Sequence, residues 1–172
     1  LGEEGYEEVI VQPLHIIPGE EFDYIKHMVK EYEPCFKKIE IGRPIFHYEG
    51  FESGPDDYSY FVDTMKDLIE KNSPCVFVGH GSAHPSNAVY GCLQSVLIDK
   101  DYEDVFVGTV EGYPNFSNVL KKAKKKDIKE ITIIPLMVVA GDHAKNDMAS
   151  DEEDSWKSRF ESEGIKANVI LK

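Results

Sequence analysis

Short apolar runs alternate with longer amphipathic stretches along this chain, and this alternation restricts the fold more than any other feature of the sequence. Residues 9–14 are rich in β-branched side chains, which is typical of a buried strand, whereas residues 20–32 repeat apolar side chains at helical spacing. Strands that alternate with helices indicate an α/β fold with parallel sheets and right-handed crossovers. The full pattern predicts strands at residues 9–14, 39–41, 75–78, 105–110, 131–139 and 167–171, and helices at residues 20–32, 58–71, 87–98 and 116–125.

A last helix is predicted to begin at Ser150. Ser150 and Glu153 have the spacing of a capping box, in which each side chain satisfies a backbone N–H group of the first turn. The acidic run at residues 151–154 would then lie in that first turn, where the helix dipole favours carboxylates.

Residues 7–21 resemble residues 129–143, so the chain contains an internal repeat. A helix and then a strand are predicted after both copies, which indicates two similar Rossmann-like domains with parallel sheets flanked by helices. We place the first domain at residues 1–72 and the second at 73–172. The elements at residues 75–126 have no counterpart before the first copy, so we expect the first domain to be incomplete at its N-terminus. The matching pairs are Glu8 with Glu130, Pro13 with Pro135, Leu14 with Leu136, and Gly19 with Gly141.

The charge balance narrows the choice of partners. The 172 residues include 19 Lys and Arg against 32 Asp and Glu, a net charge of −13, whereas nucleic-acid binding requires a basic face. No apolar run is long enough to cross a membrane, so neither nucleic acid nor membrane is an expected partner. The sequence leaves a homo-oligomer open.

Three scattered cysteines, Cys35, Cys75 and Cys92, fit no paired metal spacing and are expected to be small core residues in a reducing compartment. We therefore expect a cytoplasmic protein. The opening residues 1–10 show no signal peptide, but an exported form stays open because the N-terminus is expected to be missing.

Three side chains that can bind a metal or a proton follow three different predicted strands. His80 lies in a Gly-His-Gly-Ser motif after residues 75–78, Glu111 follows residues 105–110, and His143 follows the longest apolar run. The carboxyl ends of parallel strands meet at one sheet edge, where ligands of α/β proteins bind. Two imidazoles and a carboxylate suit Co²⁺, Fe²⁺, Ni²⁺ or Zn²⁺. The alternative is a polar cleft without a metal.

The repeat adds a fourth candidate, because it aligns Glu21 with His143 and so predicts that an acid and an imidazole face each other across one cleft. Gly81 allows a ligand to approach the backbone closely, and His84 is near enough to His80 to line the same cleft. His15 aligns with Met137 and is interpreted as a packed strand residue. His27 is expected on a helix surface, and the role of His47 is left open. The sequence contains no P-loop, G-x-G-x-x-G or G-x-S-x-G motif, which argues against kinase, dinucleotide and hydrolase functions.

Four segments together resemble the anaerobic cobalt chelatases of cobalamin biosynthesis, the sirohydrochlorin cobaltochelatase family. They are PLHIIPGEEF at residues 13–22, FVGHGSAHPSNAVYGCL at 77–93, VEGYP at 110–114, and PLMVVAGDHAKNDMASDEEDSWKSRF at 135–160. The resemblance covers essentially the whole chain. It implies the fold of class II chelatases such as protoporphyrin ferrochelatase, in which two α/β domains flank a tetrapyrrole cleft.

The resemblance also implies a reaction, the insertion of Co²⁺ into sirohydrochlorin without ATP or an organic cofactor. His80 and His143 match the catalytic, metal-binding histidines of the family, Glu111 matches its carboxylate metal ligand, and Glu21 matches an acidic residue of the cleft. Two alternatives stay open. One is a chelatase for another divalent metal, such as Fe²⁺ on the route to sirohaem, and the other is a non-catalytic carrier of tetrapyrrole or metal.

Overall fold

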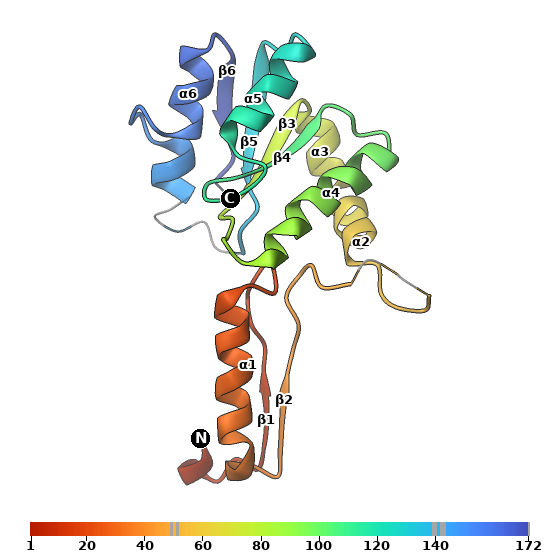
Figure 1. The fold of residues 1–172 in the computed structure, drawn as a ribbon, viewed down its shortest axis with the longest axis vertical. Coiled ribbons are helices and arrows are strands. Elements are labelled where there is room, and N and C mark those ends of the chain that lie inside the picture. Colours follow the sequence, from red (N-terminus) through yellow and green to blue (C-terminus); the bar gives the residue numbers. More distant parts are fainter. Residues whose placement is uncertain (49, 51, 139–140, 142–143, 172) are drawn as a thin grey trace.

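The structure, a computed structural model, describes residues 1–48, 50, 52–138, 141 and 144–171 (Figure 1). Its elements confirm the predicted α/β alternation. The strands are β1 (Glu8–Val11), β2 (Lys38–Ile41), β3 (Cys75–Gly79), β4 (Val105–Thr109), β5 (Glu130–Pro135) and β6 (Lys166–Val169). The α-helices are α1 (Glu20–Tyr32), α2 (Asp57–Thr64), α3 (Lys66–Asn72), α4 (Ala88–Asp99), α5 (Phe116–Lys125) and α6 (Trp156–Ser162). Shorter helical segments are η1 (Gly2–Glu4), η2 (Glu33–Cys35), η3 (Pro85–Asn87) and η4 (Ala144–Ala149), the last of which is a π-helix.

The larger sheet has the strand order β4-β3-β5-β6, and every pair of neighbours is parallel, as predicted. All residues of β3 and β4 are buried, because helices cover both faces of this sheet (Figure 1). Side chains alternate between the faces. Val76 and Val78 pack in a core with α5 and α6, whereas Cys75 and Phe77 pack in a second core with α2, α3 and α4.

Aromatic side chains fill the core beneath α5 and α6. The rings of Phe116 and Phe160 lie 4.7 Å apart, and Trp156 meets Phe116 edge-on at 5.2 Å. A β-carbon at Gly108 would lie 2.3 Å from the Trp156 ring, so the glycine lets this ring lie directly on β4. The same indole anchors the start of α6 against the sheet.

Several sequence-based predictions about element bounds are wrong. The last helix begins at Trp156, and its N-cap is Ser155, whose hydroxyl accepts a hydrogen bond from Ser158 N–H at 3.1 Å. Ser150 does not cap it, because Ser150 follows the π-helix and its Oγ donates back to Asn146 O. Residues 151–154 form the turn before α6.

The single helix predicted at residues 58–71 is wrong as well. The structure has two helices there, α2 and α3, because Met65 between them has φ −87° and ψ 2°, outside helical values. Strands β1 and β5 end earlier than predicted, at Val11 and Pro135, close to the prolines that the repeat aligns, Pro13 and Pro135. A proline has no N–H group to donate to a strand ladder.

The cysteines differ from one another. Cys75 is buried in the second core, and burial raises the pKa of its thiol to about 12, which keeps it protonated and inert. Cys92 is half-buried. Cys35 is exposed, so the prediction of a core cysteine is wrong at that position. All three are unbridged.

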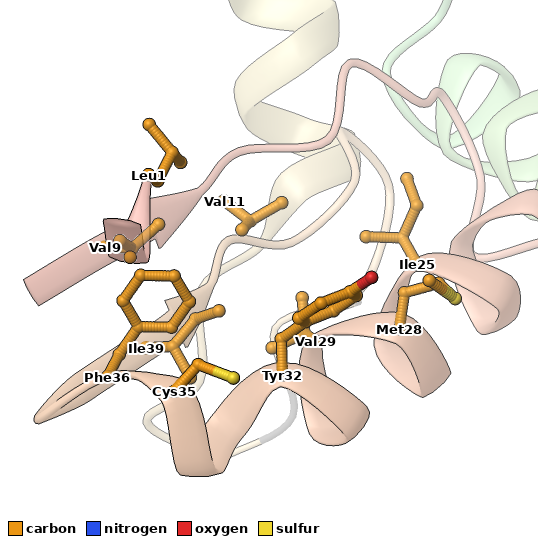
Figure 2. A pocket seen from close by; sticks show the side chains of 11 residues that line it. Leu1, Val9, Val11, Ile25, Met28, Val29, Tyr32, Cys35, Phe36 and Ile39 are labelled. Carbon is orange, nitrogen blue, oxygen red and sulfur yellow. The ribbon is translucent and has the colours of Figure 1, made fainter. Parts of the chain in front are cut away.

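The smaller sheet contains β1 and β2, which are parallel, with α1 packed along them (Figure 1). Of the described residues in α1, only Phe22 is buried. Between this helix and the sheet lies an apolar hollow of about 580 Å³, lined by side chains such as Val9, Ile25 and Ile39 (Figure 2). This part of the molecule therefore leaves much of its apolar surface only half covered.

The two sheets are joined where β1 and β2 continue as extended chain. Ile45 N–H donates to His15 O and Phe46 N–H donates to Ile16 O, both at 3.0 Å. The Phe46 ring is fully buried in the second core, stacked 5.0 Å from Tyr58. Helices α2 and α3 pack on the larger sheet although they precede residue 73, and the domain division at residue 72 stays a prediction. Within the described residues, none of the helices has both the length and the apolar character needed to cross a bilayer.

Candidate functional site

The carboxyl ends of β4, β3 and β5 lie side by side and carry the predicted site segments. Backbone hydrogen bonds continue the ladder beyond the strands. Val110 N–H donates to Gly79 O at 3.0 Å, Glu111 N–H to His80 O at 2.7 Å, and Leu136 N–H to Val78 O at 2.8 Å. The sheet therefore fixes the backbones of His80 and Glu111 next to each other, at neighbouring strand ends, as the sequence predicts.

Gly81 is required for this close approach. Its φ is +87°, and a β-carbon there would lie 2.2 Å from Glu111 O. Any other residue would strain the backbone and push the His80 loop away from the Glu111 loop. Gly81 N–H also lies 3.4 Å from the hydroxyl oxygen of buried Tyr90, which accepts its hydrogen bond.

Asn87 joins the same two loops and was missed by the sequence analysis. Its Oδ1 accepts a hydrogen bond from Ser82 N–H at 3.1 Å, and its Nδ2 donates to Tyr113 O at 2.6 Å. Gly112 leaves room for it, because a β-carbon there would lie 2.5 Å from Asn87 Oδ1. The signal in the sequence is weak, since an asparagine before a helix is usually only a cap.

A hollow of about 370 Å³ opens at this sheet edge, and both copies of the repeat line it. Leu14, His15 and Ile16 come from the first copy, whereas Leu136, Met137 and Val138 come from the second. Glu21 and His80 line the same hollow, together with Gly81, Ser82 and Tyr90. Segments that follow β1, β3 and β5 thus line one hollow. The predicted placement of Glu21 and His143 across one cleft stays a prediction.

The predicted site residues are only partly brought together. His80, Gly81 and Glu21 line the hollow, whereas Glu111 lies at the adjacent strand end and is not among its described lining residues. His143 lies outside the described residues. Over the described part of the chain, no group of three or more His, Cys, Asp and Glu side chains is placed to hold a metal ion. The metal set that includes His143 stays a prediction.

His84 contacts residues from both halves of the chain. Its Nδ1 accepts a hydrogen bond from Ser86 N–H at 3.2 Å, and its Nε2 lies 3.4 Å from a carboxylate oxygen of Asp23 on α1. A hydrogen bond from Lys26 is the main cause that lowers the pKa of Asp23, and His84 adds to it. His84 is not among the described residues that line the hollow.

His15 differs from its interpretation as a strand residue, because β1 ends at Val11. It is half-buried in the wall of the hollow, and its Nδ1 is buried with no hydrogen-bond partner in the described structure. Of the remaining histidines, His27 is exposed on α1, as predicted. His47 packs edge-on against Phe22 at 6.2 Å.

The whole chain, residues 1–172, matches the family model described as cobalt chelatase (CbiK). The chain belongs to this cobalt chelatase family. A sirohydrochlorin cobaltochelatase of Salmonella typhimurium is 35% identical over 174 residues, which cover 99% of this chain and 63% of the relative. Sirohydrochlorin cobaltochelatase CbiKC of Nitratidesulfovibrio vulgaris is 30% identical, over 98% of this chain and 60% of the relative. The chain spans about three fifths of the length of these curated relatives.

Proposed function

We propose that this protein is a sirohydrochlorin cobaltochelatase, which inserts Co²⁺ into sirohydrochlorin without ATP, and that the residues at the strand ends form its active site. The observation that carries the proposal is the hollow itself, which His80 and Glu21 line from opposite halves of a chain that matches the cobalt chelatase family throughout. Both relatives described above are named for this activity. Co²⁺ and sirohydrochlorin are the substrates, and no organic cofactor takes part.

The reaction exchanges protons for a metal ion. The macrocycle loses two pyrrole protons, Co²⁺ loses its bound water, and the metallated ring leaves with the same net charge. A neutral imidazole can accept such a proton near neutral pH, and a carboxylate can accept a hydrogen bond from a pyrrole N–H group. Apolar walls at Leu14, Ile16, Leu136 and Val138 suit the faces of a flat, largely apolar ring and reduce the access of water.

The residues divide into roles by their chemistry. His80, Glu111 and His143 bind the incoming metal, since two imidazoles and a carboxylate suit Co²⁺. His80, His143 and Glu21 act on the pyrrole protons. The Nδ1 of His80 lies 3.2 Å from Gly81 O, so a proton on Nδ1 can be donated there. In that tautomer, Nε2 carries the lone pair that both metal binding and proton acceptance require.

The remaining parts of the proposal concern substrate contacts and domains. Gly81, which lines the hollow, contacts the tetrapyrrole. His84, which lies beside Asp23 of α1, contacts it as well. Residues 1–72 and 73–172 form two similar Rossmann-like domains on the two sides of the cleft. The parallel pairing in both sheets and the helix and strand that follow each repeat copy support this division.

A spectrophotometric metallation assay tests the function. The protein is mixed with sirohydrochlorin and either Co²⁺ or Fe²⁺ and compared with a His80→Ala, His143→Ala double variant and a His27→Ala control on the exposed side of α1. We expect cobalt insertion above the uncatalysed rate, unchanged in the control and reduced by about 10²–10⁴-fold in the double variant. Undiminished insertion by the double variant contradicts the assigned roles. Tight ring binding without acceleration by either metal indicates a carrier instead.

A further inference from the structure

His15 is held in the wall of the hollow by its backbone. Its backbone carbonyl accepts a hydrogen bond from Ile45 N–H at 3.0 Å, which fixes the residue where the chain leaves β1. The side chain is half-buried, and Nδ1 is buried without a hydrogen-bond partner in the described part of the chain. Histidines that serve only the fold usually have such a nitrogen paired, because an unpaired buried polar atom is costly.

The internal repeat shows that packing alone does not require an imidazole here. His15 aligns with Met137, and both residues line the same hollow. A flexible apolar side chain therefore fills the equivalent position in the second copy. The first copy instead carries a polar ring whose buried Nδ1 has no hydrogen-bond partner among the described residues. This points to a partner for the imidazole that enters from the hollow.

The lining of the hollow indicates what that partner is. Its described lining residues include no Lys or Arg, so the hollow does not suit the many carboxylates at the edge of sirohydrochlorin. Its polar side chains are instead Glu21, His15 and His80, with Ser82 and Tyr90, set among apolar ones. Groups that exchange hydrogen bonds and protons, inside apolar walls, suit the inner face of a tetrapyrrole, where the nitrogen atoms lie.

We propose that His15 is a substrate-binding residue whose imidazole hydrogen-bonds the inner nitrogen atoms of the tetrapyrrole from the first half of the chain. This inference rests on the proposed function and extends it. Imidazole can either donate to a bare ring nitrogen or accept from a pyrrole N–H group, according to its tautomer. His15 and Glu21 thus contact the ring from the first half of the chain, and His80 contacts it from the second.

The test measures the Kd of metal-free sirohydrochlorin by fluorescence quenching, without cobalt, in variants of residue 15. His15→Met copies Met137, the aligned residue of the second repeat copy, and we expect it to weaken binding by about 5–30-fold, the loss of one or more hydrogen bonds. His15→Asn, which places an amide near the position of Nδ1, should retain much of the affinity. His15→Gln, whose amide lies near the position of Nε2, should not. His27→Met is the matched control on the surface of α1 and should bind like the unaltered protein.

The outcomes separate the inference from the function on which it rests. Failure of the unaltered protein to bind sirohydrochlorin refutes both. Normal ring binding with an unchanged Kd in His15→Met refutes only the inference, even if the melting temperature falls. A porphyrin with fewer carboxylates provides a second arm, because a loss confined to sirohydrochlorin would assign His15 to a carboxylate and overturn the contact with the ring nitrogens.

Discussion

Each of the two sheets contains one copy of the sequence repeat, yet the sheets differ sharply in how well helices cover them. The larger sheet has four strands with helices on both faces, and β3 and β4 are buried throughout (Figure 1). The smaller sheet has two strands and one packed helix, in which Phe22 is the only described buried residue. Buried apolar area is the main source of folding free energy, so the larger sheet supplies most of the stability.

The difference matters because the candidate site needs both sheets. His80 and Glu111 stand on the well-packed side, where the strand ladder and Asn87 fix their loops. Glu21 and His15 stand on the thinly packed side and depend on the junction between the sheets for their positions. Regions with few buried contacts open at lower free energy than the rest of a protein. The first half is therefore the side of the cleft whose geometry a small change can alter most easily.

A matched pair of isoleucines tests the comparison with the largest expected effect. Ile69 on α3 is fully buried in the core of the larger sheet, whereas Ile25 on α1 is half-buried beside the apolar hollow of Figure 2. We expect Ile69→Ala to lower the free energy of unfolding by about 2–5 kcal/mol and Ile25→Ala by less than about 1.5 kcal/mol. Urea denaturation followed by circular dichroism measures both.

The two substitutions are equivalent in helix propensity and volume, so their difference reports burial alone. Equal losses would show that the first half is packed as tightly as the second, which would contradict the inferred difference in packing between the two sheets. Separate unfolding transitions at two urea concentrations would sharpen it, since two-state behaviour fails when parts of a chain unfold independently.

Asp57 provides the second test, because it joins the segment after β2 to α2. Its carboxylate pairs with Arg43 and accepts hydrogen bonds from the N–H groups of His47 at 3.0 Å and Tyr48 at 2.9 Å. Burial alone would raise its pKa, but the Arg43 hydrogen bond and the two N–H groups outweigh burial and lower the pKa below 3.8. We expect Asp57→Asn to cost about 1–3 kcal/mol at neutral pH, the value of hydrogen bonds to a charged group.

The pH dependence of that loss follows from the direction of the shift. A carboxyl whose pKa is lower in the folded state stabilises the protein above its unfolded pKa, and this stabilisation disappears as the pH falls through the folded pKa. The difference between the unaltered protein and Asp57→Asn should therefore be full at pH 7 and shrink below about pH 4. A constant difference between these pH values would mean that the charge of Asp57 does not hold the junction.

The sequence predicts the elements better than it predicts the site. Helix α5 and helix α1 match their predicted bounds because each has one continuous apolar stripe, a purely local signal. The start of α6 was misplaced because Ser150 and Ser155 both suit an N-cap, and only the packing of Trp156 against the sheet decides between them. The role of His15 could not be found locally either, since it depends on which residues of the distant repeat copy share its hollow.

The smallest expected effect concerns the direct contact between the halves, in which Asp23 on α1 lies 3.4 Å from Nε2 of His84. Asp23 also pairs with Lys26 within its own helix at 2.6 Å, so Lys26→Gln is the control that removes only the local pair. Exposed ion pairs contribute little, and we expect Asp23→Asn to lower the melting temperature by about 2 °C at most. High salt should remove even that difference, because it screens exposed charges.

If Asp23→Asn and His84→Gln, but not Lys26→Gln, instead raise the KM for sirohydrochlorin severalfold, then this weak pair sets the distance between α1 and the His84 loop at the site. In that case the thinly packed half is held at the cleft by its contacts with the other half rather than by a core of its own.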